Sequence, residues 1–111
     1  MLIYKILRAG EWAELERAGE SAGAPIDVAD GYIHFSTADQ AAETAARHFA
    51  GETRLKLLAY DADDLSPLEW EPSRGGQLFP HLYAPLRRDQ ALWVADLPFE
   101  EGRHVFPEGM V

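Results

Sequence analysis

The sequence predicts a single α+β domain of five or six short, mostly antiparallel strands and two main helices, with the strands in one sheet or in a split one. Its 111 residues, 47% of them hydrophobic and 26% charged, suit one domain with its own core. Short apolar segments with strand character alternate with two segments of helical spacing. Several connections are too short for the helical crossovers that parallel strands need, which favours antiparallel pairing.

The N-terminal elements are predicted to be a strand and a helix. Residues 2–7 (LIYKIL) have the apolar run of a mostly buried strand. Residues 10–19 are expected to form a helix, because Trp12 and Leu15 are separated by one helical turn. Residues 21–25 contain glycine and proline, so the regular pattern is expected to stop there.

From Tyr32 onward the pattern has the period of two that is typical of a strand. Ile33 and Phe35 are predicted to point to one side, and Tyr32, His34 and Ser36 to the other. The imidazole of His34 is therefore expected to face away from the apolar pair.

The second helix is predicted over residues 38–49, where alanines and Phe49 form an apolar stripe and Gly51 provides the stop. Ser36 and Thr37 are both candidates for the N-cap, with Asp39 and Gln40 as their capping-box partners. The small side chains of the stripe predict close packing against a sheet.

The second half of the chain is predicted to contain more strands than helices. A loop is expected over residues 73–86, which contain two glycines and two prolines. A turn or a single helical turn is expected over residues 61–65. The predicted strands are residues 54–60, 68–71 and 91–97, with an edge strand at 102–106.

Charge and composition narrow the classes of function. The chain carries 19 acidic and 10 basic residues, a net charge of −9, and its basic residues are scattered except for Arg87 and Arg88. A nucleic-acid surface needs clustered basic residues, so no nucleic-acid partner is expected.

No cysteine is present, which removes thiolate chemistry and Cys-ligated zinc. No apolar run approaches the roughly 20 residues of a membrane span, so we expect a cytoplasmic protein without a membrane partner.

Two short stretches combine polar groups with aromatic and aliphatic residues: 31–37 (GYIHFST) and 74–83 (RGGQLFPHLY). They contain His34 and His81, and imidazole is the side chain best suited to proton transfer near neutral pH. Three interpretations remain open. The two histidines share a catalytic or binding site, they make structural hydrogen bonds, or they join one carboxylate in a non-local metal site. His48 has the position of a helix-end residue, and His104 gives no signal.

Longer motifs identify a resemblance. The run APIDVADGYIHFSTADQ is followed by an alanine-rich helix ending in ARHFAG, the strand RLKLLAYD, the segment EWEPSRGGQLFPHLYAPL and the strand ALWVADLPF. Together they resemble the family called domain of unknown function 952, over nearly the whole chain. Ala84 stands where many members have glycine, and Lys5 where some have histidine.

This family has been grouped by distant similarity with the ADP-ribosyltransferase superfamily, whose split-sheet α+β fold binds NAD in a cleft. The resemblance implies a small-molecule site for NAD or an ADP-ribose-type ligand and glycosyl-transfer chemistry. The catalytic residues it implies are His34, His81 and Glu71. The ligand-binding residues it implies are Tyr4, Ser36, Thr37, Arg74, Gln77 and Tyr83. A binding module without turnover is the alternative, and the sequence predicts no oligomeric state.

Overall fold

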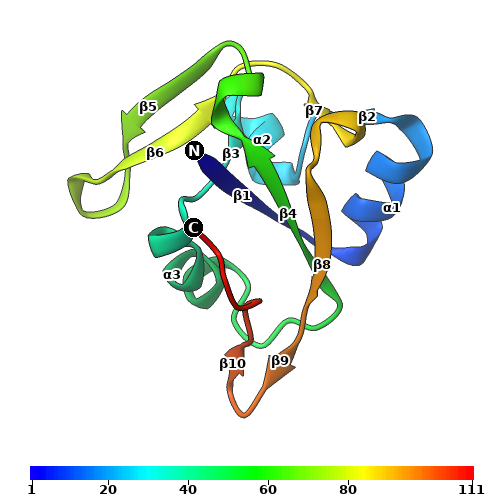
Figure 1. Cartoon of the computed structure of the whole chain (residues 1–111), viewed down its shortest axis with the longest axis vertical. Helices are drawn as coiled ribbons and strands as arrows, with labels where there is room; N and C mark the ends of the chain where they lie inside the picture. The colour runs from blue at the N-terminus through cyan, green and yellow to red at the C-terminus, as the bar shows by residue number, and fades with distance from the viewer.

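Four small antiparallel sheets and three helices make up the fold (Figure 1). The computed structural model describes residues 1–111 apart from the side chain of Arg74. The α+β class and the antiparallel pairing are confirmed, since every named strand pair is antiparallel. None of the described helices has the length and apolarity that a membrane span requires.

The central sheet has the strand order β1-β4-β8, formed by Leu2–Leu7, Leu55–Asp61 and Trp93–Leu97. Both of its faces are covered. In β1, Ile3 and Leu7 belong to one buried cluster, whereas Tyr4 and Ile6 belong to another. Lys5 therefore lies on the Ile3 side of a strand that is buried from Ile3 to Leu7, an environment that disfavours a charge.

The second three-stranded sheet has the order β3-β6-β5, formed by Ile33–His34, Leu78–Leu82 and Leu68–Pro72. In its register His34 lies opposite His81, and His81 lies opposite Glu69. An isolated bridge between Tyr4 and Ser36 joins this sheet to β1. The alternation of side chains places eight polar and aromatic residues on one face. They are Tyr32, His34, Ser36, Glu69, Glu71, Phe79, His81 and Tyr83.

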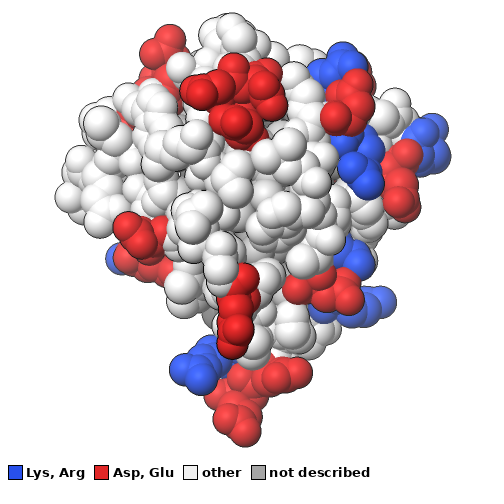
Figure 2. All heavy atoms as spheres, in the orientation of Figure 1, with Lys and Arg blue, Asp and Glu red and all other residues white. Residues whose placement is uncertain are grey.

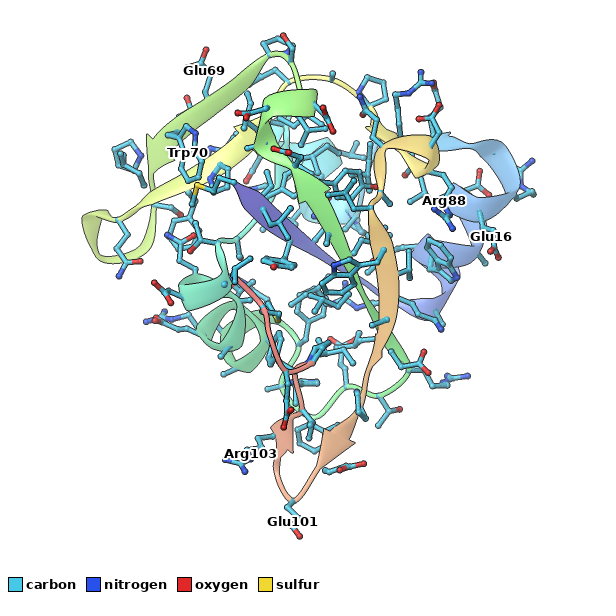
Figure 3. The ribbon with its side chains drawn as sticks, viewed as in Figure 1. Glu16, Glu69, Trp70, Arg88, Glu101 and Arg103 are labelled. Atoms are coloured by element: carbon cyan, nitrogen blue, oxygen red, sulfur yellow. The ribbon has the colours of Figure 1, made fainter. Side chains whose placement is uncertain are left out.

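Two hairpin-sized sheets complete the strands. In one, β2 (Glu20–Ser21) pairs with β7 (Leu86–Arg87). In the other, β9 (Phe99–Glu100) pairs with β10 (Arg103–His104), with Glu101 at the tip of the hairpin (Figure 3). The 3-10 turns η1, η2 and η3 span Ala62–Asp64, Arg74–Gly76 and Arg88–Gln90.

The helices have clear start and stop signals. α1 (Ala9–Ala18) and α2 (Pro25–Asp30) both end at a glycine in the left-handed region, with φ of 80° at Gly19 and 86° at Gly31. α3 (Ala38–His48) begins after Thr37, whose backbone N–H donates to the Gln40 side chain at 3.0 Å. Its buried alanines, Ala41 and Ala45, allow the close packing on the sheet that the sequence predicted.

Two predictions were wrong. The predicted number of elements was too low, because no element was predicted for α2 or for the two-residue strands β2, β7 and β9. The predicted loop 73–86 contains β6 and the first residue of β7 instead. Proline is disfavoured inside a sheet because it lacks a backbone donor. Here Pro80 lies opposite Phe35, one residue beyond the end of β3, and its carbonyl accepts from the Phe35 N–H at 3.0 Å. The missing N–H of Pro80 therefore breaks no hydrogen bond within β3.

Gly23 packs tightly against the side chains of Asp27 in α2 and Ile33 in β3. Its φ of 98° is in the left-handed region, and a Cβ there would lie 2.4 Å from Asp27 Oδ2 and 2.7 Å from Ile33 Cδ1. We predict that Gly23→Ala lowers the free energy of unfolding by roughly 2–4 kcal/mol, from backbone strain and steric overlap. Urea unfolding measures it. Gly10→Ala is the matched control: a Cβ at Gly10 meets nothing within 4 Å, and alanine favours helix by about 1 kcal/mol. Equal effects of the two substitutions would contradict this account of Gly23.

Candidate functional site

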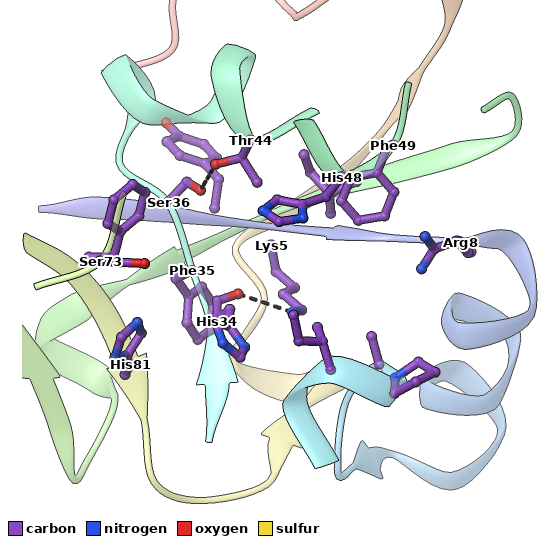
Figure 4. A pocket seen from close by; sticks show the side chains of 16 residues that line it. Lys5, Arg8, His34, Phe35, Ser36, Thr44, His48, Phe49, Ser73 and His81 are labelled. Carbon is purple, nitrogen blue, oxygen red and sulfur yellow. Dashed lines mark hydrogen bonds between the residues drawn. The ribbon is translucent and has the colours of Figure 1, made fainter. Parts of the chain in front are cut away.

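A cavity of about 370 Å³ lies beside the polar face of the β3-β6-β5 sheet (Figure 4). β1, β3 and β6 contribute to its walls, together with residues of α2, α3 and the loop after β5. Both His34 and His81 line it, so the structure brings the two histidine stretches into one site. The lining residues are Tyr4, Lys5, Ile6, Arg8, Ala24, Pro25, Ile26, His34, Phe35, Ser36, Thr44, His48, Phe49, Ser73, Phe79 and His81.

The ionisable groups that line this cavity are mostly basic. Apart from Tyr4 they are Lys5, Arg8, His34, His48 and His81, and no carboxylate is among the described lining residues. This is unexpected for a chain with 19 acidic and 10 basic residues. On the face seen in Figure 2, Lys and Arg side chains lie mostly beside Asp and Glu and form no extended basic patch. The lining is therefore a local exception, although Lys5 and Arg8 are each paired with a carboxylate outside the lining, Asp27 and Glu52, which offsets their charge.

Lys5 is satisfied by a buried ion pair with Asp27. The side chains of Lys5 and Asp27 are 6% and 0% exposed, and Lys5 Nζ donates to Asp27 Oδ2 at 2.8 Å. Nζ also donates to the carbonyl oxygen of His34 at 3.0 Å, as drawn in Figure 4. This contact links the middle of β1 to α2 and to β3.

Asp27 accepts three further hydrogen bonds. The backbone N–H of Ala24 donates to Oδ2 at 2.7 Å, and the backbone N–H of His34 to Oδ1 at 3.0 Å. His34 Nδ1 lies 2.6 Å from Oδ1. Burial by itself would raise the pKa of Asp27, but the hydrogen bonds from His34 and the charge of Lys5 outweigh it and lower the pKa to about 2. Burial also lowers the pKa of Lys5, and Asp27 opposes that change.

The outer nitrogen of His34 has a different partner. Nε2 lies 3.0 Å from Asp30 Oδ2, a carboxylate at the end of α2 that is 43% exposed. The His34 ring thus lies between a buried carboxylate and an exposed one.

His81 is held by a second carboxylate. Its side chain is 4% exposed, and Nδ1 lies 2.8 Å from Glu71 Oε1. Tyr83 donates its hydroxyl to the same oxygen at 2.8 Å. The hydrogen bonds from His81 and Tyr83 lower the pKa of Glu71, and the bond to Glu71 raises the pKa of Tyr83 to about 12. Of the two ring nitrogens of His81, Nδ1 has a hydrogen-bond partner among the described residues and Nε2 has none there.

Tyr32 packs against both histidines. Its ring centroid lies 4.6 Å from that of His34 and 4.1 Å from that of His81, and Tyr83 lies 5.2 Å away. The centroids of His34 and His81 are 5.4 Å apart. This aromatic packing fixes the spacing between the two imidazoles.

Comparison with known proteins gives the family of this chain. The sequence model described as "Protein of unknown function (DUF952)" matches residues 6–94, most of the chain. The chain belongs to the DUF952 family. Asp27, His34, Glu71 and His81 all lie inside the matched region, and Lys5 lies one residue before it. No curated protein matches this chain.

Solved structures agree with this assignment. The crystal structure of protein CC0527 from Caulobacter crescentus is 46% identical, with a TM-score of 0.90 over 95% of this chain and 94% of that chain. The solution NMR structure of CC0527 gives a TM-score of 0.83 at 46% identity, over 93% of this chain and 90% of that chain. The fold described above is therefore that of a solved structure.

The predicted ligand-binding residues of this DUF952 chain have different positions. Tyr4 and Ser36 line the cavity, but the Tyr4 hydroxyl donates to the Val111 carbonyl at 3.1 Å, and Ser36 Oγ lies 2.9 Å from Thr44 Oγ1. Thr37 and Gln77 do not line it: Thr37 begins α3, and Gln77 accepts from Gln40 at 3.4 Å. The side chain of Arg74 lies outside the described residues. Glu71, an implied catalytic residue, contacts His81, whereas Glu69 on the same strand points outward from β5 (Figure 3).

The sequence reasoning missed the role of Asp27. The signal was a lysine in the middle of the apolar strand 2–7, because a buried ammonium requires a carboxylate partner. The sequence did not show which of the 19 acidic residues supplies it. Among the described residues, no group of three or more His, Cys, Asp or Glu side chains is placed to hold a metal ion, so the metal site from His34, His81 and one carboxylate stays a prediction.

The buried pair makes a double-mutant cycle informative. We predict that Asp27→Asn lowers the free energy of unfolding at pH 7 by roughly 3–5 kcal/mol, because Lys5 is left as an uncompensated buried charge. Lys5→Met together with Asp27→Asn is expected to lose less than the sum of the two single substitutions. Chemical denaturation of the four proteins measures the coupling. Strict additivity would show that the pair does not act as a unit.

The pKa of Asp27 predicts acid sensitivity. It is about 2 in the folded state and 3.8 in the reference state, so the carboxylate stabilises the fold above pH 3.8. That contribution, about 2 kcal/mol, is lost as the pH falls from about 3.8 to about 2. Urea titrations at pH 2, 3, 4 and 5 measure it against Asp27→Asn, in which this part of the pH dependence is expected to be absent. An identical pH profile in both proteins would exclude Asp27 as its source.

Proposed function

We propose that this DUF952 protein binds an NAD- or ADP-ribose-type nucleotide in the cavity between His34 and His81, and that the site has the parts required for transfer at the ribose. The observation that carries the proposal is the meeting of two carboxylate-held imidazoles in one cavity whose other charged side chains are basic. Phosphate and pyrophosphate are the anions that such a cavity suits.

The cavity also has apolar walls that suit a base. Ile6, Ile26, Phe35, Phe49 and Phe79 line it. A few polar groups among apolar walls are typical of small-molecule sites. Its volume of about 370 Å³ is near the lower end of the range for such sites, roughly 300–1,000 Å³. We infer that one nucleotide half occupies the cavity and that the rest of a dinucleotide extends past Tyr32.

Each histidine has a role that follows from its partners. Glu71 holds Nδ1 of His81, so Nε2 is the ring nitrogen that contacts the ligand, either as a hydrogen-bond donor or as a proton acceptor. His34 is held in the same way by Asp27, and its Nε2 becomes available when Asp30 is displaced. Glu71 is not among the lining residues, so its role is to orient His81 and to stabilise the imidazolium when His81 takes a proton.

Two alternatives use the same residues. A binding module would hold the nucleotide without turnover, and purely structural histidines would bind nothing. The packing of Tyr32 on both rings favours a structural contribution as well as a ligand role. Binding and turnover must therefore be measured separately.

Substitutions that preserve one ring nitrogen separate these functions. The amide nitrogen of asparagine replaces Nδ1, so His81→Asn keeps the bond to Glu71 and removes Nε2. We predict that it weakens ADP-ribose binding about tenfold or more, because a hydrogen bond to a charged oxygen contributes roughly 1.5–3 kcal/mol. Titration calorimetry with ADP-ribose and with NAD measures this.

His104→Gln is the matched control, because His104 uses Nε2 to contact the Glu52 carbonyl at 2.9 Å in a different part of the molecule. Its affinity for ADP-ribose is expected to equal that of the wild type. NAD consumption, followed by chromatography, distinguishes an enzyme from a binding module. Failure of the wild type to bind either nucleotide at millimolar concentration would remove the proposal.

A further inference from the structure

We propose that Lys5 is an amine site for aldehydes: it forms a protonated imine with the open-chain aldehyde of a phosphorylated sugar, such as ribose 5-phosphate or the free ribose end of ADP-ribose. This inference rests on the proposed function, since it names a ligand class for the same cavity. It concerns a residue to which that function gives no chemical role.

The position of Lys5 supports the proposal. The side chain lines the cavity although it is only 6% exposed, so the cavity is its route to small molecules. An ammonium carries three N–H groups. Within the described part of the chain, Nζ has two hydrogen-bond acceptors, Asp27 Oδ2 and the His34 carbonyl oxygen. One direction around the nitrogen is left for a new bond.

Burial favours the neutral amine that reacts. Desolvation lowers the pKa of Lys5, and the amine of a lysine in an apolar site is a better nucleophile than one in water. Asp27 opposes this effect in the free protein, because it stabilises the ammonium. The same carboxylate then favours the product, since a protonated imine keeps the positive charge beside Asp27.

The reaction balances without a cofactor. The ammonium of Lys5 gives one proton to water, and the neutral nitrogen attacks the aldehyde carbon, forming the C–N bond. The carbonyl oxygen becomes a hydroxyl by taking the second proton from nitrogen. The C–O bond then breaks as that oxygen is protonated and leaves as water, which gives the protonated imine.

The lining explains why the aldehyde should carry a phosphate. His81 lines the same cavity as Lys5, with Nδ1 held by Glu71, and no described lining residue is acidic. A sugar phosphate can place its anion at this imidazole and its aldehyde at Lys5. In NAD both ribose C1 atoms are bonded to nitrogen, so NAD has no aldehyde to react and serves as the negative control.

The chain offers an internal comparison, because Lys5 and Lys56 are its two lysines. The side chain of Lys56 is 32% exposed and pairs with Asp96 on the surface. The wild-type protein is incubated with ribose 5-phosphate and cyanoborohydride at pH 7, which reduces the imine to a stable secondary amine. Peptide mass mapping then gives the labelling of each amine.

We expect Lys5 to be labelled severalfold faster than Lys56, since burial lowers the pKa of Lys5 and a lower pKa raises the neutral fraction of an amine at pH 7. ADP-ribose is expected to label Lys5, NAD is expected not to label it, and His81→Asn is expected to remove the advantage of ribose 5-phosphate over ribose. Labelling of Lys56 at the rate of Lys5 or faster would overturn the inference. Because the comparison is made within one folded protein, it does not depend on a stable Lys5 variant.

Calorimetry separates this inference from the proposed function. Binding of ADP-ribose without labelling of Lys5 would overturn the imine and leave nucleotide binding intact. Labelling of Lys5 by ribose 5-phosphate without binding of ADP-ribose or NAD would overturn the nucleotide proposal alone.

Discussion

The ion pair between Lys5 and Asp27 is the interaction on which the rest of this site depends. Two opposite charges, both nearly inaccessible to water, must be fully hydrogen-bonded to be tolerated. Asp27 meets this requirement by accepting from Lys5, Ala24 and His34. The contacts tie α2, a helix of six residues that is too short to be stable alone, to β1 and β3. The pair therefore holds α2 in place, and α2 forms one wall of the cavity.

The two imidazoles are held in unequal ways. His34 is fixed by a carboxylate that is buried and by its own backbone N–H, whereas His81 is fixed by Glu71, which is 38% exposed. His34 is therefore tied into the buried part of the fold, whereas the carboxylate that holds His81 is partly open to solvent. This difference explains why substitutions at Asp27 are expected to reduce stability and substitutions at His81 to reduce binding.

Much of the fold followed from local pattern, and the errors have physical causes. The alternation around His34 and the capping of α3 by residues near Thr37 were predicted because they depend on neighbours in the sequence. β6 was missed because Pro80 is tolerated only through its non-local partner, Phe35. Likewise, the sequence suggested a shared site for His34 and His81 as one of three interpretations, but it did not show that Asp27 joins His34 to Lys5. A partner 22 residues away leaves no periodic signal.

The central claim is that His34 and His81 face one ligand across one cavity. Long-range ¹H–¹⁵N spectra of the imidazole nitrogens, recorded while ADP-ribose is added to the wild-type protein, test it most directly. The account predicts that the Nε2 resonances of His34 and His81 shift together, with one dissociation constant, while those of His104 stay unchanged. Saturable shifts at His104 with none at His34 and His81 would contradict it, as would no shift at any histidine.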